Sequence, residues 1–417
     1  MSPVDGDKVP LRVQCAVYGV GGFSTTMHFM AVTIVPLWVV GLELSPFLLG
    51  IVLGCRPVLP LLLSIHTGAL MDRIGGRRVM LFFAALGLLV PLLYPALPFL
   101  WAVIALQLLW GLADSMGWLG AQTLIGQLMR GRTVYAGRLA VASRLGNIVG
   151  PPVAGAMWDL AGPWAAFGLA CVAGLGALGS ALMLPAPPQR TAGAEGAAEA
   201  PGRPLRAFLP RPSDYVATFR LLAVPTVAIT VAIGMMTHVG NNVQATFYVV
   251  WLNETGISGT LIGTLFSISS MAASVGPLLA APLTRYIRAY WLLWFVVWAS
   301  IVLIAVTPVL GTYLALAAVL SLRNLFTGIH QPLVITLTLR TAGPESQGKA
   351  IGLRGTANRV TSVAAPVIMG AVGEVAGLEA SFYVIGLGAS LLMIVLALWM
   401  TRHPEIHENA AEGGARR

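Results

Sequence analysis

The stretch Gly68-Ala69-Leu70-Met71-Asp72-Arg73-Ile74-Gly75-Gly76-Arg77-Arg78 decides the fold of this chain. It is a short, charged turn between two long apolar runs at 46–70 and 79–97. Each run is long enough to cross a bilayer, which takes about 20 residues per helix. Short loops rich in arginine face the cytoplasm in most membrane proteins. The turn therefore predicts a membrane protein and places this loop on the cytoplasmic side.

The spacing of the residues in this turn carries a family resemblance. The pattern Gly-x-x-x-Asp-Arg-x-Gly-x-Arg-Arg resembles the loop between helices 2 and 3 in transporters of the major facilitator superfamily, and it is formed by Gly68, Asp72, Arg73, Gly75, Arg77 and Arg78. Only Gly76 departs from the pattern, at a position that is usually basic. The resemblance implies a gating loop, in which Asp72 caps the partner half near the start of helix 11 and closes the outward-facing state on the cytoplasmic side. The alternative, that the arginines are only stop-transfer charges, explains neither the aspartate nor the glycines.

The composition excludes a soluble globular protein. Of the 417 residues, 57% are hydrophobic and 10% are charged, whereas soluble domains carry roughly 25% charged residues. The formal net charge of +9 comes almost wholly from arginine on one side of the predicted membrane, so it reports topology and gives no support to nucleic-acid binding. The three cysteines lack metal-type spacing, and His403 and His407 have no further ligand nearby. We therefore expect no metal and no cofactor.

Twelve apolar segments follow one another in two groups of six. They lie at 13–40, 46–70, 79–97, 99–128, 137–159 and 163–184, and then at 219–252, 258–283, 289–309, 311–339, 349–376 and 378–400. Residues 185–218 are rich in proline and glycine and cannot form a span, so they are interpreted as a cytoplasmic linker. We expect an all-α integral membrane fold with two six-helix bundles, 1–184 and 219–400, followed by a cytoplasmic tail at 401–417.

The distribution of charge agrees with this layout. The predicted outer loops carry acidic residues and neither Lys nor Arg, the acids being Glu43, Asp159, Glu254, Glu374 and Glu379. The predicted inner segments carry many arginines, among them Arg130, Arg132, Arg285, Arg288 and Arg402. Because Lys and Arg concentrate on the cytoplasmic side, we expect both termini in the cytoplasm and the chain in the inner (plasma) membrane.

The two halves also repeat one another. At an offset of 215 residues, the pairs are Arg144 with Arg359, Pro151 with Pro366, Gly155 with Gly370, Asp159 with Glu374 and Gly162 with Gly377. At an offset of 213, they are His28 with Asn241, Trp38 with Trp251 and Gly50 with Gly263. Parallel repeats of this kind predict two pseudo-symmetric bundles related by an axis along the membrane normal, with a substrate site between them near the midplane.

Asp114 is the one acid well inside a predicted span. On a helix it shares a face with Trp110 and Trp118, each four residues away. An acid between two indoles could hold a cationic or lipophilic substrate through charge and cation–π contact, or take up a proton. The alternative is a structural aspartate paired with Arg56 or Arg144.

Arginines at membrane depth offer a second chemistry. Arg56 and Arg323 lie at comparable depth, and two central arginines could clamp an anion. The alternative is that each neutralises Asp114 or a helix end. Arg144 and Arg359 lie nearer the cytoplasmic surface and are related by the repeat, which makes them gating candidates as well as structural ones.

A polar face marks the seventh predicted helix. Asn241 and Gln244 lie one turn apart, with Asn242 beside them, and such a face looks into protein or water rather than lipid. In the major facilitator superfamily, helices 1, 4, 7 and 10 line the cavity, so the resemblance makes these residues substrate contacts. Hydrogen bonding between helices is the alternative. His28, on the first predicted helix, is a further candidate, against the alternative of a packing role.

The fifth predicted helix carries an element made of Gly146, Gly150, Pro151 and Gly155. It resembles an element of the proton-coupled antiporters in the same superfamily, with Ala156 in place of the last glycine. The resemblance favours export. However, the arginine typical of helix 4 in those antiporters is Gln107 here, and the first-helix acid of many drug exporters is missing. Proton coupling would then rest on Asp114 or a histidine.

These patterns favour a secondary transporter over an enzyme, because no nucleotide loop, metal cluster or nucleophile–base pair is evident in the sequence. We expect proton-coupled antiport that exports a small amphiphilic molecule by alternating access, with a monomer as the working unit in the lipid bilayer. The alternative is transport of a small organic anion held by Arg56 and Arg323.

Overall fold

The computed structural model describes residues 9–63, 71, 75–129, 132–185, 222, 224–341 and 343–402, and it places their side chains except at 133 and 339–352. These residues are helical apart from short turns, and no strand occurs among them. The predicted all-α fold is confirmed. Within the predicted gating loop, Gly68, Asp72 and Arg73 lie outside the described residues. So do most of the predicted linker and the tail beyond 402, with His403 and His407.

Each predicted span has a helical counterpart. The first half contains α1 (Leu11–Val40), α2 (Pro46–Gly54), α4 (Gly76–Ala96), α5 (Leu100–Leu128) and α6 (Thr133–Leu182). The second half contains α8 (Pro225–Ala245), α9 (Phe247–Glu254), α10 (Gly259–Leu283), α11 (Ala289–Ala305), a 3-10 turn (Thr307–Val309), α12 (Tyr313–Thr341), α13 (Gly343–Ala376) and α14 (Leu378–Arg402). Within the described part of the chain, eight helices are long and apolar enough to cross a membrane.

Two interruptions distinguish these helices from the predicted spans, and a third, inside α6, separates two spans as predicted. The helix after Pro46 breaks at 55–57, where Pro57 has no N–H to continue it, and resumes at 58–63. The predicted span at 219–252 breaks at Thr246, between α8 and α9. In α6 the chain reverses direction at Gly162, whose φ of +74° suits a residue without Cβ. Irregular backbone at membrane depth is tolerated where it is buried in protein or lines a cavity, so the first two breaks point toward a site.

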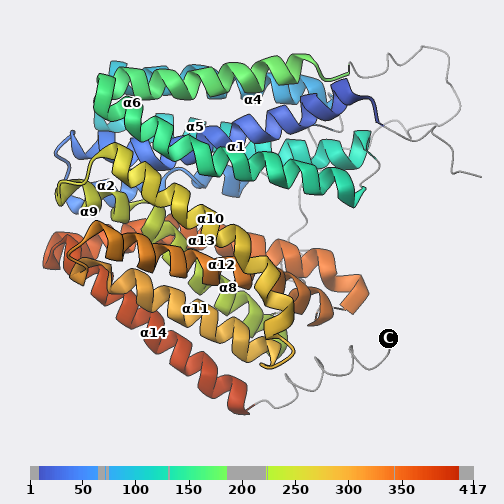
Figure 1. Cartoon of the computed structure of the whole chain (residues 1–417), viewed down its shortest axis with the longest axis vertical. Coiled ribbons are helices and arrows are strands. Elements are labelled where there is room, and N and C mark those ends of the chain that lie inside the picture. The colour runs from blue at the N-terminus through green and yellow to red at the C-terminus, as the bar shows by residue number, and fades with distance from the viewer. Residues whose placement is uncertain are drawn as a thin grey trace, which may run out of the picture.

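The helices form two bundles that lie side by side (Figure 1). In the first, α1 and α4 pack against both α5 and α6. In the second, α12 packs against α10 and α11, and α14 packs against α11 and α13. The bundles meet along two lines, α6 with α10 and α2 with α13.

One end of the molecule is acidic and the other basic. We call the acidic end the one that carries Glu43, Asp159, Glu254, Glu374 and Glu379, and the basic end the one that carries Arg77, Arg78, Arg132, Arg285, Arg288 and Arg402. The acidic end lies at the left in Figure 1. The two sets separate because successive spans run in opposite directions.

The hydrophobic core is shared at the acidic end and divided at the basic end. The largest buried cluster combines side chains of both halves, such as Ile34 and Trp38 with Val249 and Trp251. Toward the basic end, the first half has its own cluster around Met80 and Met116 and the second half has another, which is packed around Val296. The two halves are therefore joined at the acidic end, and the space between them is not sealed by shared core toward the basic end.

The repeat is visible in the packing between the bundles. A Cβ added at Gly50 would lie 2.5 Å from the carbonyl oxygen of Pro366, and a Cβ at Gly263 would meet the backbone of Pro151 and Pro152 in the same way. Gly377 has a positive φ like Gly162, its partner in the repeat. The two lines of contact between the halves are thus versions of one another, as the offsets of 213 and 215 residues predict.

Candidate functional site

A cavity of about 470 Å³ lies between the halves, on the basic side of the shared core. Its walls come from α1, the break at 55–57, α5 and α6 on one side and from α8, α10, α12 and α13 on the other. The polar residues that line it are His28, Thr33, Arg56, Gln107, Asp114, Ser115, Arg144, Asn147, His238, Asn241, Asn242, Gln244, Thr246, Ser270, Asn324, Thr327, Gln331 and Ser362. Phe29, Val32, Leu53 and Phe266 add apolar surface. The mixture suits a small amphiphilic molecule.

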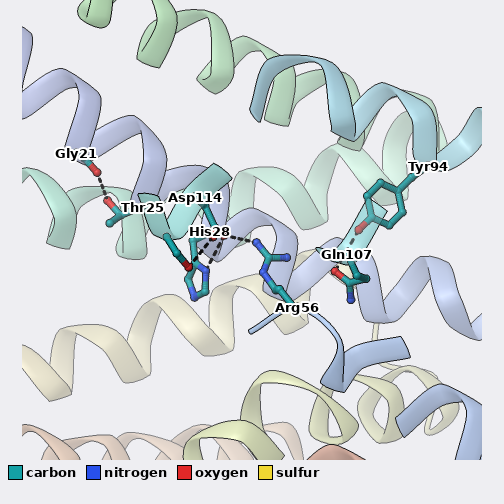
Figure 2. Close-up of polar contacts among 8 residues, drawn as sticks. Gly21, Thr25, His28, Arg56, Tyr94, Gln107 and Asp114 are labelled. Carbon is teal, nitrogen blue, oxygen red and sulfur yellow. Dashed lines mark hydrogen bonds and ion pairs between the residues drawn. The ribbon is translucent and has the colours of Figure 1, made fainter. Parts of the chain in front are cut away.

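A three-residue cluster forms one wall of this cavity (Figure 2). The carboxylate oxygen Oδ2 of Asp114 accepts a hydrogen bond from a terminal nitrogen of Arg56 and lies 2.9 Å from Nδ1 of His28. A carboxylate oxygen accepts, so Nδ1 is the donor in this contact. The Asp114 side chain is 2% exposed, whereas that of His28 is 44% exposed. The cluster therefore joins a buried ion pair to a histidine that the cavity can reach.

The break after α2 places Arg56 in this cluster. Gly111 on α5 allows the approach, because a Cβ there would collide with the backbone and side chain of Arg56. The other face of the guanidinium packs on the ring of Trp110, with 5.2 Å between Cζ and the ring centroid. Desolvated cation–π contacts of this kind add to the ion pair.

The predicted pair of indoles around Asp114 does not line the cavity. Trp110 is fully buried and contacts Tyr94 and Phe167, and Trp118 packs against the cluster at the basic end. The spacing of four residues correctly predicted one shared face of α5. It could not show that Trp110 turns toward α4 and α6. The cation that packs on its ring is Arg56 and not a ligand.

Arg323 and Arg56 are not brought together as an anion clamp. Arg323 is 1% exposed and lies behind the cavity wall, where it donates to the side-chain oxygens of Gln244 and Asn241, the latter at 2.9 Å. Arg56 is already held by Asp114. Arg56 lines the cavity but Arg323 is not among the lining residues, so the two guanidinium groups do not face one ligand from the cavity wall as a direct clamp needs.

The predicted polar face of the seventh span does line the cavity. Asn241, Asn242 and Gln244 are all among its walls, and the amide nitrogen of Asn242 donates to Oγ of Ser362 at 3.1 Å. The break at Thr246 ends α8 just beyond this face. The sequence left two roles open for these side chains, contact with the cavity and hydrogen bonding between helices. In the structure they have both.

The two arginines related by the repeat occupy different surroundings. Arg144 lines the cavity from α6. Arg359, on α13, donates to the carbonyl oxygen of Pro60 in the opposite half. A gating role remains a proposal for each.

The glycine and proline element of α6 and the described part of the predicted gating loop take part in packing and hydrogen bonds. Gly146 and Gly150 pack against Thr26 of α1, while Gly155 and Pro151 pack against α10. Gly75 caps α4 with a φ of +90°, and Arg77 donates to the carbonyl oxygen of Leu182 at 3.1 Å. Arg78, at the start of α4, is exposed.

Sequence reasoning missed several cavity residues. Asn324, Thr327 and Gln331 of α12 line the cavity, as do Asn147 and Ser362. The first three recur at steps of three and four, which is a polar helical stripe that the sequence displays. The stripe lies one position away from Arg323 and His330, the residues that drew attention by their charge.

Acidic side chains tie the halves together at the acidic end. Asp159, at the end of the first part of α6, accepts from the backbone N–H of Gly259 at 2.9 Å and from N–H and Oγ1 of Thr260 at 2.7 and 2.6 Å. Glu374, its partner in the repeat, accepts from the N–H of Phe47 at 3.1 Å. Each acid therefore caps the first turn of a helix in the opposite half, α10 or α2.

Comparisons with known proteins agree with this architecture. The sequence profile of the Major Facilitator Superfamily matches the chain twice, over residues 17–240 and 230–417. No curated protein matches it in sequence. Among solved structures, the crystal structure of a mutant of the nucleoside transporter NupG matches with a TM-score of 0.74 and 13% identity, covering 94% of this chain and 99% of that chain. At this identity the likeness concerns the fold alone.

Proposed function

The chain belongs to the Major Facilitator Superfamily and is therefore a membrane transporter rather than an enzyme, and we propose that it exchanges a small amphiphilic molecule for protons. Alternating access would come from rocking of the two bundles around the central cavity. By the distribution of arginine, the basic end and both termini face the cytoplasm of the inner membrane. We propose the monomer as the working unit, because the cavity is formed between the two halves of one chain.

The single observation that carries the proton coupling is the contact of His28 with Asp114 at the cavity wall. An imidazole exposed to the cavity can exchange a proton there, while its N–H holds the buried carboxylate. A donor group on the solute that reached Asp114 would compete with the N–H of His28 for the same oxygen. A solute that takes this oxygen would remove the carboxylate that stabilises the protonated imidazole, so His28 would release its second proton to the cavity as the solute binds, which is the coupling that antiport needs.

Export is supported by the glycine and proline element of α6, which resembles that of the proton-coupled antiporters. In this structure it forms close packing between α6, α1 and α10. The element would let α6 slide or tilt against both neighbours with little steric resistance, because small residues bring the backbones together.

Transport of an organic anion is the second candidate. It is favoured by Arg144 on the cavity wall and by Arg323 behind it, and by the single carboxylate, that of Asp114, among the described residues that line the cavity. The direct clamp by Arg56 and Arg323 has less support, because Asp114 neutralises Arg56 and because Arg323 lies behind two amides, outside the cavity lining.

The proposal is tested in proteoliposomes that contain a pH-sensitive dye. Wild type, Asp114→Asn and His28→Gln are compared with Ser115→Ala, a control at the same wall, over a panel of cationic, neutral and anionic amphiphiles. We expect proton movement with at least one solute class in wild type and in the control, and none in the first two variants. Solute movement without proton movement in wild type, or proton movement that survives Asp114→Asn, would contradict the proposed coupling.

A further inference from the structure

Arg323 is a buried cation whose partners are both amides. Its guanidinium donates to Oε1 of Gln244 and to Oδ1 of Asn241, and its Nε has no hydrogen-bond partner among the described residues. Only 1% of the residue is exposed. Burying a charge in this way is costly unless another charge or ligand compensates it.

The described residues offer no carboxylate to Arg323. The carboxylate that lines the cavity, Asp114, is held by Arg56 and His28 on the facing wall. The other acids whose side chains the structure places are gathered at the acidic end. The positive charge of Arg323 is therefore balanced neither by an ion pair nor by solvent, and its field reaches the cavity through the two amides.

The same contacts fix the orientation of the amides. A guanidinium has only donors, so the oxygens of Asn241 and Gln244 must face Arg323 and their NH₂ groups must face away from it. Both residues line the cavity, and neither NH₂ group donates to another described protein group. Hydrogen bonding to a cation on one side of an amide strengthens the donors on its other side. The wall thus presents a pair of polarised donors with a buried positive charge behind them.

We infer that this wall, formed by Asn241 and Gln244 and backed by Arg323, binds a carboxylate group of the transported solute. The inference rests on the proposed function, in which this cavity carries the solute. It differs from an arginine clamp because the anion contacts the amides, and Arg323 is a positioning residue that acts through them. The apolar body of the solute would lie toward Phe266 and Phe29, and the opposite wall with His28 and Asp114 would address its other end.

The exchange of one amide nitrogen for an oxygen tests this assignment. Gln244→Glu keeps an oxygen acceptor for Arg323, but it removes the NH₂ donor and supplies the missing negative charge inside the protein. Asn242→Asp is the matched control, since it adds the same charge to the cavity from a residue that donates to His238 and Ser362 and not to the guanidinium system. A third variant, Arg144→Gln, removes the cation that lines the cavity from α6.

The probes are 4-phenylbutyrate, its carboxamide and 4-phenylbutylamine, which share one apolar body and differ in the end group. Binding to the purified full chain in detergent is measured from the rise in melting temperature with ligand concentration. We expect wild type to prefer the carboxylate. This preference over the carboxamide should fall by about tenfold or more in Gln244→Glu, because hydrogen bonds to a charged group are the stronger ones. It should fall clearly less in Asn242→Asp and in Arg144→Gln.

Three outcomes would overturn the inference: no binding of the carboxylate by wild type, an equal loss in Gln244→Glu and Asn242→Asp, or loss of the preference in Arg144→Gln while it persists in Gln244→Glu. A generally unstable variant would lower the melting temperature without ligand but would leave the ratio between the two probes unchanged. The dye assay with Asp114→Asn reads proton coupling independently, so failure of the proposed function and failure of this binding site give different results.

Discussion

The two acidic caps at the acidic end should control which end of the molecule is closed. Asp159 accepts three hydrogen bonds from the first turn of α10, and Glu374 accepts one from the first turn of α2. All four bonds cross between the halves, so rocking that opens the acidic end must break them. The substitution Asp159→Asn keeps the side-chain shape but removes the charge and one of the two acceptor oxygens.

The size of the effect follows from these contacts. Hydrogen bonds to a charged acceptor contribute about 1.5–3 kcal/mol each, and an anion at a helix N-terminus adds about 0.3–1 kcal/mol. Asp159 is exposed, so water replaces part of what is lost. We expect about 1–2 kcal/mol, which lowers the ratio of closed to open acidic ends by about five- to thirtyfold. Glu374→Gln, with one bond, should have the smaller effect.

The assay is a distance measurement between spin labels in lipid nanodiscs. One pair, Leu160→Cys with Val375→Cys, reports on the acidic end, and a second, Val134→Cys with Tyr286→Cys, reports on the basic end. All four positions are exposed. The labels are placed in a background without the native cysteines. In Asp159→Asn, the fraction of molecules with the longer distance at the acidic end should increase, and so should the fraction with the shorter distance at the basic end.

The matched control is Glu254→Gln, which removes a charge at the same end from an exposed residue whose side chain makes no hydrogen bond or ion pair with the other half among the described residues. Distance distributions that are the same in Asp159→Asn as in wild type would refute the reasoning. An equal shift in Glu254→Gln would show that the total charge of this end, and not the caps, sets the equilibrium.

Three other expectations follow from the packing. Gly50→Ala should disfavour the same closed state, because its Cβ would lie 2.5 Å from a backbone oxygen and 3.1 Å from the Cα of Gly370, and the same labels should report opening of the acidic end. Arg56→Gln should lower stability by about 3–5 kcal/mol, since it leaves the carboxylate of Asp114 buried without its strong partner, and the double variant with Asp114→Asn should recover part of the loss in a thermal melt. Trp110→Ala should cost about 3–5 kcal/mol because the ring is fully buried. A site for cationic ligands built on its indole would instead show selective loss of cation binding without a loss of stability.

The order of the helices could be predicted because each span and each loop is marked by its own residues. Apolar length, arginine placement and the turn at 68–78 predicted the order of spans, including the separate spans at 137–159 and 163–184 that meet at the reversal inside α6. The interruptions at 55–57 and at Thr246 were not predicted, although Pro57 was visible. Whether a proline bends a helix or ends it depends on what the freed carbonyl groups can contact, and that is a property of the neighbouring helices.

Of the site, the sequence could predict which residues share one face of a helix, but not what that face contacts. The spacing of three and four residues correctly grouped Asn241 with Gln244, and Trp110 with Asp114. It could not tell that the first pair faces the cavity and that Trp110 faces Phe167, because the direction of a face is set by packing across helices. The pairing of Arg56 with Asp114 was weighed as an alternative from the sequence, whereas the isolation of Arg323 behind two amides needed the three-dimensional arrangement.

The repeat separates the part of the molecule that moves from the part that binds. The contacts between the halves are matched in pairs, Gly50 with Gly263 and Asp159 with Glu374, so opening and closing use similar surfaces on both sides of the pseudo-symmetry axis. The cavity walls are not matched: His28, which contacts Asp114, corresponds to Asn241, which contacts Arg323. Divergence at these positions allows one wall to exchange protons and the other to hold the solute. It follows that substitutions in the matched contacts should alter proton and solute movement together, whereas substitutions in the two walls should alter them separately.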